Sequence, residues 1–371
     1  MARPAIAEID LESISKNFQL ASSLCPQGRT IAVVKADAYG HGIEEVSSAL
    51  SGQAGAFATA SIEEALTIRS AGLRHPILLL EGFFEFAELE EISMQGFWTA
   101  VHDEHQLEQL ERATLPEPIS VWLKIDTGMH RLGFDPGEAL KVFRRLQSIP
   151  HVKNIVIMSH LANADAAVSQ GISVESQILR LPREFIDSEI DTSLANSAGL
   201  LDHELARRNW QRPGIMLYGS SPLEVENHYS QQLQAAMTLK SKIIATRWIE
   251  PGEQVGYGGR FIASRRSRIG AVAIGYADGY PRQARDGTPV LVGGQRTRIV
   301  GRVSMDMLTV DLTDISNAHV GVDVELWGKN LPAKEVADCC NTIPYHLFTG
   351  VTKRVPRTYL GSPKTSSPIW P

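Results

Sequence analysis

The chain has few cysteines and no long apolar run. Three cysteines occur among 371 residues, and they predict neither a disulfide framework nor a CxxC metal site. No apolar stretch approaches the roughly 18–20 residues that span a bilayer. The opening stretch MARPAIAEIDLESI carries Glu8, Asp10 and Glu12 where a signal peptide needs an apolar core. We therefore expect a cytoplasmic protein with reduced thiols, no metal and no membrane contact.

An excess of basic residues is also missing. The formal net charge is -6 and the pI is near 6.0, which argues against a nucleic-acid partner. Hydrophobic residues make up 43% and charged residues 21%, as in ordinary folded proteins. A length of 371 residues exceeds what one hydrophobic core usually serves, so two domains are expected.

Short apolar, β-branched runs recur through the first 220 residues or so, each followed by helical periodicity. Most are continuously apolar, which is typical of parallel strands covered on both faces. Eight such units predict a (β/α)8 TIM-type barrel. An open doubly wound sheet would more often show a GxGxxG turn, and the chain has none. The predicted strands lie at 30–36, 56–60, 76–82, 97–101, 119–126, 154–162, 192–198 and 214–219.

The pattern changes after about residue 235. Short strands separated by Gly, Pro, Asp and Asn turns predict a compact, mostly antiparallel β-domain. We therefore expect an α/β fold with a barrel domain at 1–235 and a C-terminal β-domain at 236–371. The opening strand AIAEID is compatible with either domain.

Ionisable residues gather at the ends of only some predicted strands. In a barrel these carboxyl ends form the active-site rim. The second, third and fourth strands end in Ala60, Gly82 and Val101, whereas the first, fifth, sixth and seventh end in polar groups. A single polar strand end usually just meets solvent, but this uneven distribution indicates a site. The rim residues are Lys35, Tyr39, His41, Lys124, Asp126, Arg131, Ser159, His160, Asn196 and Ser197.

A lysine at a barrel mouth suggests Schiff-base chemistry. Burial beside cations lowers the pKa of an amine from about 10.4, which frees it to attack a carbonyl. Two options remain open from the residues alone: an aldolase-type lysine, or a lysine that holds pyridoxal 5'-phosphate (PLP). The stretch ANSAG at 195–199, at the start of a predicted helix, is suited to grip a phosphate.

Seven stretches, in order, resemble the PLP-dependent alanine racemases, whose barrels belong to fold type III. The resemblance runs from about residue 4 to 360 and covers both predicted domains. The stretches are VVKADAYGHG, KIDTGMHRLG, LANSAG, RPGIMLYG, GYGGR, AIGYADGYPR and GRVSMDMLTVDL.

The resemblance implies an amino-acid racemase (an isomerase) that uses PLP to interconvert L- and D-alanine. It also implies a head-to-tail homodimer in which each site is completed by the partner. Lys35 would hold PLP covalently and act as one catalytic base, and Tyr257 of the partner would act as the opposite base. The role, D-alanine synthesis for peptidoglycan or alanine catabolism, is left open.

The same resemblance assigns the other site residues. Arg131 would contact the cofactor and the substrate carboxylate, and Lys124 is a position where family members often carry a carbamylated lysine. Met305 would offer its backbone N–H to the substrate, and Tyr276 and Asp306 would line the path by which substrate enters. The remaining cofactor contacts would be Tyr39, His160, Asn196, Ser197, Arg212, Gly214, Ile215 and Tyr345.

Sequence reasoning alone does not point to several of these residues. Arg212 precedes the predicted eighth strand, Tyr257 lies in a turn, and Met305 lies on a predicted strand as a core side chain. The rival functions are racemisation of another small amino acid and decarboxylation by a barrel-type PLP enzyme. Arg212 and the stretch SMDM disfavour the decarboxylases, which resemble this chain but place a glutamate at the ring nitrogen and use a Cys-Asp pair. A non-catalytic PLP carrier would resemble the barrel alone.

Overall fold

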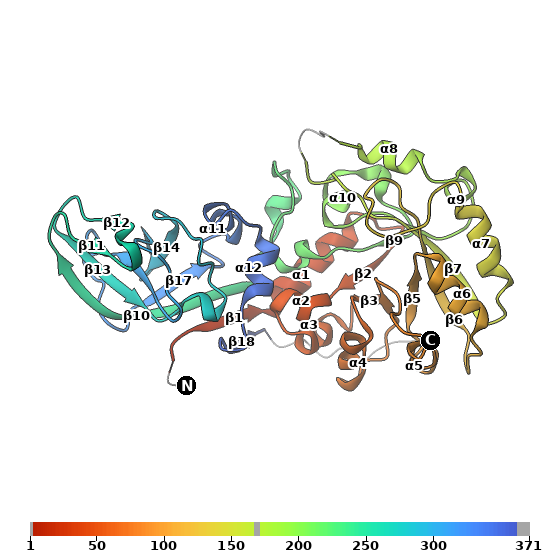
Figure 1. Ribbon diagram of the computed structural model, residues 1–371, viewed down its shortest axis with the longest axis horizontal. Coiled ribbons are helices and arrows are strands. Elements are labelled where there is room, and N and C mark those ends of the chain that lie inside the picture. The colour runs from red at the N-terminus through yellow and green to blue at the C-terminus, as the bar shows by residue number, and fades with distance from the viewer. Residues whose placement is uncertain (1–2, 167–170, 362–371) are drawn as a thin grey trace. The chain divides into compact units, whose positions relative to one another are not determined.

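The computed structural model describes residues 3–166 and 171–361, which divide into two compact units. The barrel unit comprises residues 14–38 and 43–233, and the sheet unit comprises residues 3–13, 39–42 and 234–361. Figure 1 shows the elements of each unit, coloured along the chain.

Eight parallel strands form the sheet of the barrel unit, in the order β8-β7-β6-β5-β4-β3-β2-β9. Because β9 pairs with β2, the last strand lies beside the first, as a barrel requires. The predicted barrel is therefore confirmed. Its strands are β2 (Arg29–Val33), β3 (Ala56–Thr59), β4 (Ile77–Leu79), β5 (Trp98–Val101), β6 (Ile119–Lys124), β7 (Val152–Met158), β8 (Thr192–Ser193) and β9 (Trp210–Gln211).

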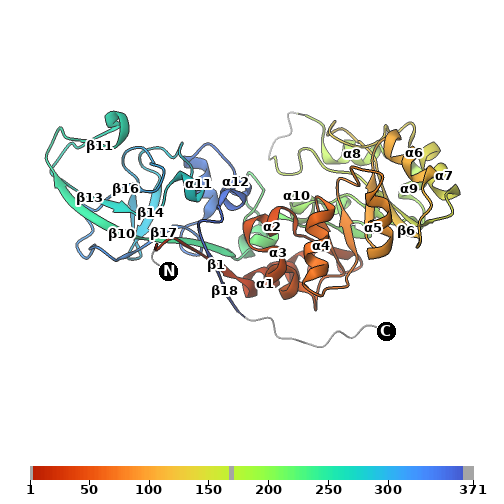
Figure 2. The same cartoon turned by 60° about the horizontal axis from the view of Figure 1, so that its bottom comes forward.

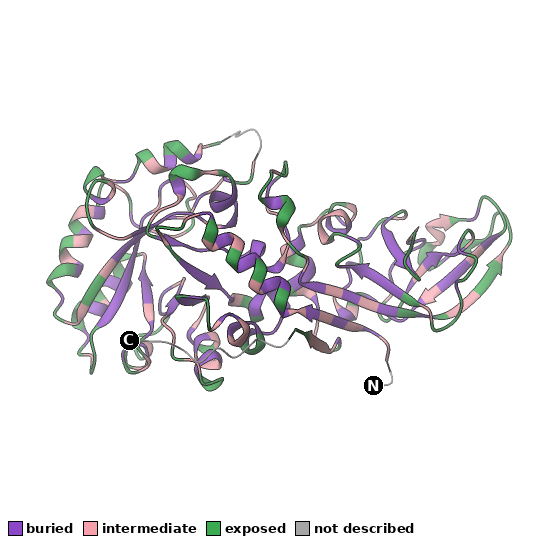
Figure 3. Cartoon of the chain, turned by 180° about the vertical axis from the view of Figure 1, so that it is seen from behind, coloured by how far each residue is buried: buried purple, intermediate pink, exposed green. Residues whose placement is uncertain are grey.

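Most residues of these strands are buried, including all six of β6, whereas β7 is buried only over its last three residues. Figure 3 shows these strands as buried, while the surrounding helices also carry exposed residues. The helices α3, α4 and α5 lie along one side of the sheet (Figure 2). The helices of this unit that follow its strands are α3 (Ile43–Leu50), α4 (Ile62–Ser70), α5 (Glu88–Gln95), α6 (Glu104–Arg112), α7 (Ala139–Ser148), α8 (Val174–Leu179), α9 (Arg183–Ile186) and α10 (Ser197–Asp202), with the 3-10 turns η1 (Glu204–Ala206), η2 (Ile215–Tyr218) and η3 (Ser230–Gln232).

The predicted eighth strand at 214–219 is wrong. Residues 215–218 form the 3-10 helix η2, and the eighth strand is the earlier β9. All four residues of η2 are buried, and a short apolar run does not reveal whether it is a buried strand or a buried helical turn. Arg212 therefore follows a strand directly, and the strand-end argument does reach it.

Side chains close the seam between β8 and β9. The Asn209 side-chain oxygen accepts from the Thr192 backbone N–H at 3.0 Å, and the Ser193 hydroxyl donates to the Trp210 carbonyl at 2.8 Å. The Arg212 N–H then donates to the Ala195 carbonyl at 3.1 Å. These bonds fix β9, and with it the position of Arg212.

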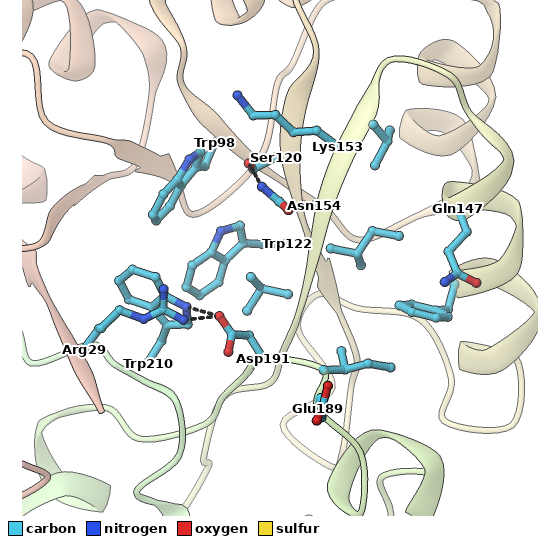
Figure 4. Close-up of a pocket in the computed structure, with 15 residues that line it drawn as sticks. Arg29, Trp98, Ser120, Trp122, Gln147, Lys153, Asn154, Glu189, Asp191 and Trp210 are labelled. Carbon is cyan, nitrogen blue, oxygen red and sulfur yellow. Dashed lines mark hydrogen bonds and ion pairs between the residues drawn. The ribbon is translucent and has the colours of Figure 1, made fainter. Parts of the chain in front are cut away.

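Three tryptophans pack together at the amino-terminal end of the barrel (Figure 4). The ring centroids of Trp98, Trp122 and Trp210 lie 5.3–5.9 Å apart. They border a cavity of about 670 Å³, whose rim carries the ion pair of Arg29 with Asp191. Catalytic groups of barrels lie at the other, carboxyl end of the strands, so this cavity is not the candidate active site.

The sheet unit is built around the long strand β10, which pairs antiparallel with β1, β13 and β17. The first half of β10 alternates between buried and less buried residues, as expected for a sheet with one core face. The opening strand β1 belongs to this sheet and also pairs in parallel with β18. The strands are β1 (Ile6–Asp10), β10 (Met237–Ile249), β13 (Ser267–Val272), β14 (Pro289–Val292), β15 (Gln295–Arg298), β16 (Leu308–Asp311), β17 (Asp323–Trp327) and β18 (Arg357–Leu360).

Smaller elements complete the sheet unit. The hairpin β11 (Gln254–Val255) and β12 (Phe261–Ile262) encloses the turn η4 (Tyr257–Gly259), and η5 (Tyr276–Asp278) follows β13. Two helices, α11 (Ala333–Cys339) and α12 (Pro344–Gly350), precede β18. Helix α1 (Leu11–Ser23) follows β1, and from residue 14 onward it belongs to the barrel unit. None of the helices within 3–166 and 171–361 is long and apolar enough to cross a membrane.

The turn after β2 is left-handed. In α2 (Lys35–Gly40), residues 36–39 have φ of 51–54° and Gly40 has φ of 79°. Left-handed helix costs a non-glycine residue roughly 1–2 kcal/mol, so this turn must be held in place. The Glu64 carboxylate accepts from the Ala36 N–H at 2.6 Å, and Asp37 accepts from the Ile43 N–H at 2.9 Å. The strain therefore falls on the segment that carries Lys35.

Candidate active site

Five basic side chains converge at the carboxyl end of the barrel. Lys124 is the last residue of β6, and the other four follow β2, β6, β7 and β9. One small hollow is bordered by Lys124, Arg131 and His160 together. Four of them, Arg212, Arg131, Lys124 and Lys35, all depress the pKa of the fifth, His160. Four of the residues that the sequence places at the rim, Lys35, Lys124, Arg131 and His160, therefore lie close together.

His160 is neutral in this environment. Burial, and then the positive charge of its neighbours, lowers the pKa of His160 from 6.5 to about 3. Its ring Nε2 lies 3.5 Å from the Asn196 side-chain nitrogen, which follows β8. A neutral imidazole can both donate and accept a hydrogen bond, which suits it to link two groups of the site.

Lys124 is buried, with 8% of its surface exposed. Burial lowers its pKa from 10.5 to about 8, Arg212 and Arg131 add to this, and Glu81 opposes it. Glu81 follows β4 and is the one acidic group among the neighbours that shift this pKa. The cluster thus holds more positive than negative charge.

Arg212 is held rigidly beneath this cluster. Its guanidinium donates to the Ser193 carbonyl at 2.8 Å and to the Ser159 carbonyl at 2.6 Å, and it also contacts the Ser193 hydroxyl. Burial lowers the pKa of Arg212 to about 10, so it remains charged at neutral pH. Because its bonds are to neutral groups, its charge is left to act on the site above.

Hydrogen-bond donors suited to an anion lie beside Arg212. Asn196 caps α10 by accepting from the Gly199 N–H at 2.9 Å, which places Ser197 at the first turn. The Ser197 hydroxyl oxygen lies 2.8 Å from the Gly214 N–H and 3.4 Å from the Met216 N–H. The amino-terminal ends of α10 and η2, including Ile215, thus meet at one hydroxyl, an arrangement that favours a bound phosphate.

The other predicted residues belong to the sheet unit. Tyr39 is buried, which raises its pKa, and its ring lies 5.9 Å from that of Tyr345 on α12. The Nδ1 of His41 lies 2.9 Å from the Tyr39 carbonyl oxygen, and its ring packs edge-on against Phe348. His41 thus makes a local turn contact.

Two predicted residues are strongly exposed. Tyr257, in η4, is 70% exposed, and Met305 is 52% exposed. The prediction that Met305 lies on a strand as a core side chain is wrong, because β16 begins only at Leu308. Backbone hydrogen bonds hold the turn at Met305. The Tyr276 N–H donates to the Ser304 carbonyl, and the Ala277 N–H donates to the Met305 carbonyl.

Salt bridges hold the Met305 turn. The buried Asp278 carboxylate binds Arg3 and Arg354, and Arg354 also reaches the Asp306 carboxylate at 2.6 Å. Arg3 donates further to the Asp306 carbonyl at 2.8 Å. Tyr276 and Asp306 are therefore parts of one ordered surface of the sheet unit.

The chain matches the family model of the alanine racemase N-terminal domain over residues 9–222, and that of the C-terminal domain over residues 236–359. The chain belongs to the alanine racemase family. It is 51% identical to the alanine racemase of Pseudomonas fluorescens over 357 residues, which cover 96% of this chain and 99% of that protein.

Solved alanine racemases share the fold. The crystal structure of the biosynthetic alanine racemase from Pseudomonas aeruginosa has a TM-score of 0.93 and 46% identity, covering 97% of this chain and 100% of that one. The alanine racemase from Bartonella henselae, solved with covalently bound pyridoxal phosphate, has a TM-score of 0.85 and 31% identity, covering 96% and 99%. PLP is the cofactor of this family.

Proposed function

We propose that this protein interconverts L-alanine and D-alanine with PLP as cofactor. The observation that carries the proposal is the group of four cations around a neutral His160, with Lys35 among them. Such an excess of positive charge favours a ligand with a phosphate and a carboxylate. Racemisation of another small amino acid is the alternative.

The described residues fit the cofactor. Lys35 would hold it covalently, Ser197, Gly214, Ile215, Tyr39 and Tyr345 would bind its phosphate, and Arg212 would face its ring nitrogen. When bound, PLP acts as an electron sink that weakens the Cα–H bond of an amino acid. A positive Arg212 disfavours protonation of the ring nitrogen, which limits side reactions. Arg212→Glu should therefore increase transamination by-product.

Racemisation needs a proton to leave one face of Cα and return to the other, so two bases are required. We assign these to Lys35 and to Tyr257 of the partner subunit in a homodimer. The exposure of Tyr257 and Met305 is compatible with residues that serve a partner's site. Arg131 and the Met305 N–H would bind the substrate carboxylate, and Tyr276 and Asp306 would line its path.

Lys124 is proposed to carry a carbamate. With a pKa near 8, a useful fraction of its amine is neutral and can attack CO₂, releasing one proton and forming an anion. Arg131 and Arg212 favour that anion, which would orient Arg131 in turn. Protein prepared with ¹³C-bicarbonate should show one carbamate carbon signal that Lys124→Met lacks.

The test is a chiral assay of alanine incubated with protein and PLP. Both enantiomers should approach equal amounts, and an unchanged enantiomer ratio contradicts the proposal. Lys35→Ala should lose the covalent cofactor that borohydride reduction fixes in the wild type, as measured by mass. A reduced adduct that persists in Lys35→Ala would place the cofactor elsewhere.

A further inference from the structure

A buried glutamine outside the predicted site uses both hydrogens of its amide nitrogen, and its amide oxygen, in hydrogen bonds. Gln177 on α8 is 0% exposed. Its amide nitrogen donates to the Thr127 hydroxyl oxygen at 3.0 Å and to the His160 carbonyl at 3.1 Å, and its oxygen accepts from the Ala162 N–H at 2.8 Å. These partners fix which end of the amide carries the nitrogen.

The bonds continue in one direction. The Ser159 hydroxyl donates to the Ile125 carbonyl at 2.8 Å, and its single hydrogen is used there. The Thr127 hydroxyl, 2.8 Å from Ser159 Oγ, must therefore donate to it, while accepting from Gln177. Gln177, Thr127 and Ser159 thus form an ordered chain, and both hydroxyl residues are 1% exposed.

This chain braces the groups of the candidate site. Ile125 directly follows Lys124, and Thr127 begins the segment that leads to Arg131. Ser159 directly precedes His160, and its carbonyl accepts from Arg212 at 2.6 Å. The ends of β6 and β7 are therefore tied together by side chains that lie beneath the cations.

We propose that Gln177 is a positioning residue for racemisation. It holds the His160 backbone directly, and through Thr127 and Ser159 it sets where Lys124 and Arg212 stand. The inference rests on the proposed function, because it assigns its effect to those residues. In metal sites, loss of an outer hydrogen bond that orients a ligand typically costs about 10–100-fold in affinity or activity, and we expect a loss of the same order here.

The main variant is Gln177→Glu in the holoenzyme, which keeps the shape. As a carboxylate it cannot donate to Thr127 or to the His160 carbonyl, and as a carboxylic acid it can donate to only one of them. The value of kcat should fall about 10-fold or more in both directions. The visible absorption band of the bound cofactor should also shift, because Arg212 moves relative to it. Thr127→Val, which replaces the hydroxyl with a methyl group, should also lower kcat and shift the band. Thr127→Ser, which keeps the hydroxyl, should leave kcat and the band as in the wild type.

Gln106 on α6 offers a matched control. Its amide nitrogen donates to the carbonyls of Phe83 at 2.9 Å and Glu81 at 3.3 Å, and its oxygen accepts from the His102 N–H at 3.0 Å. It thus braces the ends of β4 and β5 in the same way, and it holds the backbone of Glu81 and Phe83 rather than a residue proposed to bind the cofactor or act on the substrate. Gln106→Glu should lower thermal stability like Gln177→Glu but leave the absorption band unchanged.

Three outcomes overturn the inference. The first is that Gln177→Glu changes neither kcat nor the absorption band, and the second is that Thr127→Val changes neither. The third is that Gln106→Glu shifts the absorption band as much as Gln177→Glu does. Should Gln177→Glu not fold, Thr127→Val decides. The wild-type holoenzyme is assayed first, so absent racemisation there refutes the proposed function, whereas normal wild-type activity with unaffected variants refutes only the role of Gln177.

Discussion

At the scale of single residues, the charge state of His160 is the most informative feature of the site. A histidine that stays neutral among four cations can relay a hydrogen bond without adding to the positive charge. Its neighbour Arg212 is charged and donates to two carbonyls. Arg212 therefore supplies positive charge to the site, whereas His160 supplies a neutral hydrogen-bonding group.

This environment makes stability depend on pH. In the unfolded chain a histidine binds a proton near pH 6.5, but folded His160 does so only near pH 3. Between these values the unfolded state holds more protons, so stability falls as pH falls. Urea unfolding of the cofactor-free protein should show a slope of up to about 1.4 kcal/mol per pH unit from this residue.

His160→Asn supplies the comparison for this prediction. Asparagine does not titrate, so the variant should lose stability less steeply between about pH 6.5 and 4.5. Equal slopes in wild type and variant would show that His160 is not held neutral by the fold.

The two proposed bases should be separable by isotope exchange. Tyr257→Phe removes the phenol but keeps the ring, and should slow exchange of the Cα hydrogen of L-alanine in D₂O by about 10²–10⁴. Exchange from D-alanine should suffer much less, since Lys35 serves the other face. Tyr229→Phe, a partly exposed tyrosine of the barrel unit, is the control and should change neither rate. Equal slowing for both enantiomers would rule out the assignment of the bases.

At the scale of elements, the left-handed turn after β2 decides where Lys35 stands. Strand β2 ends at Val33, and residues 36–39 take a left-handed backbone conformation that the contacts around the turn must stabilise. Arg357 adds to that frame, because its guanidinium donates twice to the Gly40 carbonyl at 3.2 Å.

Gly40→Ala tests this frame. A Cβ on Gly40 would lie 2.3 Å from the Phe348 carbonyl oxygen, in addition to the strain of φ at 79°. Gly72 has φ of 86° with nothing within 4 Å, so Gly72→Ala measures the strain alone. We expect Gly72→Ala to cost about 1–2 kcal/mol of unfolding free energy, and Gly40→Ala to cost a further 1–3 kcal/mol or so.

Denaturant unfolding of the two variants under one condition gives the comparison. Equal losses would mean that the backbone around Phe348 yields without cost, and that the turn is held less firmly than its contacts indicate.

At the scale of the whole molecule, the proposed sharing of sites between subunits has a sharp test. Lys35→Ala and Tyr257→Phe should each be nearly inactive alone. If each site takes Lys35 from one subunit and Tyr257 from the other, a mixed dimer has one intact site of two. Random mixing after reversible dissociation should then restore about a quarter of the wild-type activity.

No recovery in mixed dimers, with exchange of subunits verified by mass, would place both bases in one chain. The separate variants, mixed without dissociation, serve as the control and should stay inactive.

Much of the architecture could be predicted from the sequence. Continuous apolar runs with helical spacers identify a parallel barrel, because strands covered on both faces must be apolar throughout. Lys35, Lys124 and His160, the polar residues at the ends of three predicted strands, marked the rim of the site. The eighth strand could not be placed, since the apolar run at 215–218 folds as a 3-10 turn and β9 has only two residues.

The residue pattern is sufficient to predict the barrel, the antiparallel sheet, the family motifs and the strand ends that carry the lysines. The charge state and hydrogen bonding of those side chains depend on the folded arrangement. The neutrality of His160, the burial of Lys124 and the chain from Gln177 to Ser159 depend on groups far apart in sequence. Electrostatic fields and hydrogen-bond partners are properties of distance in space, and a linear pattern does not carry them.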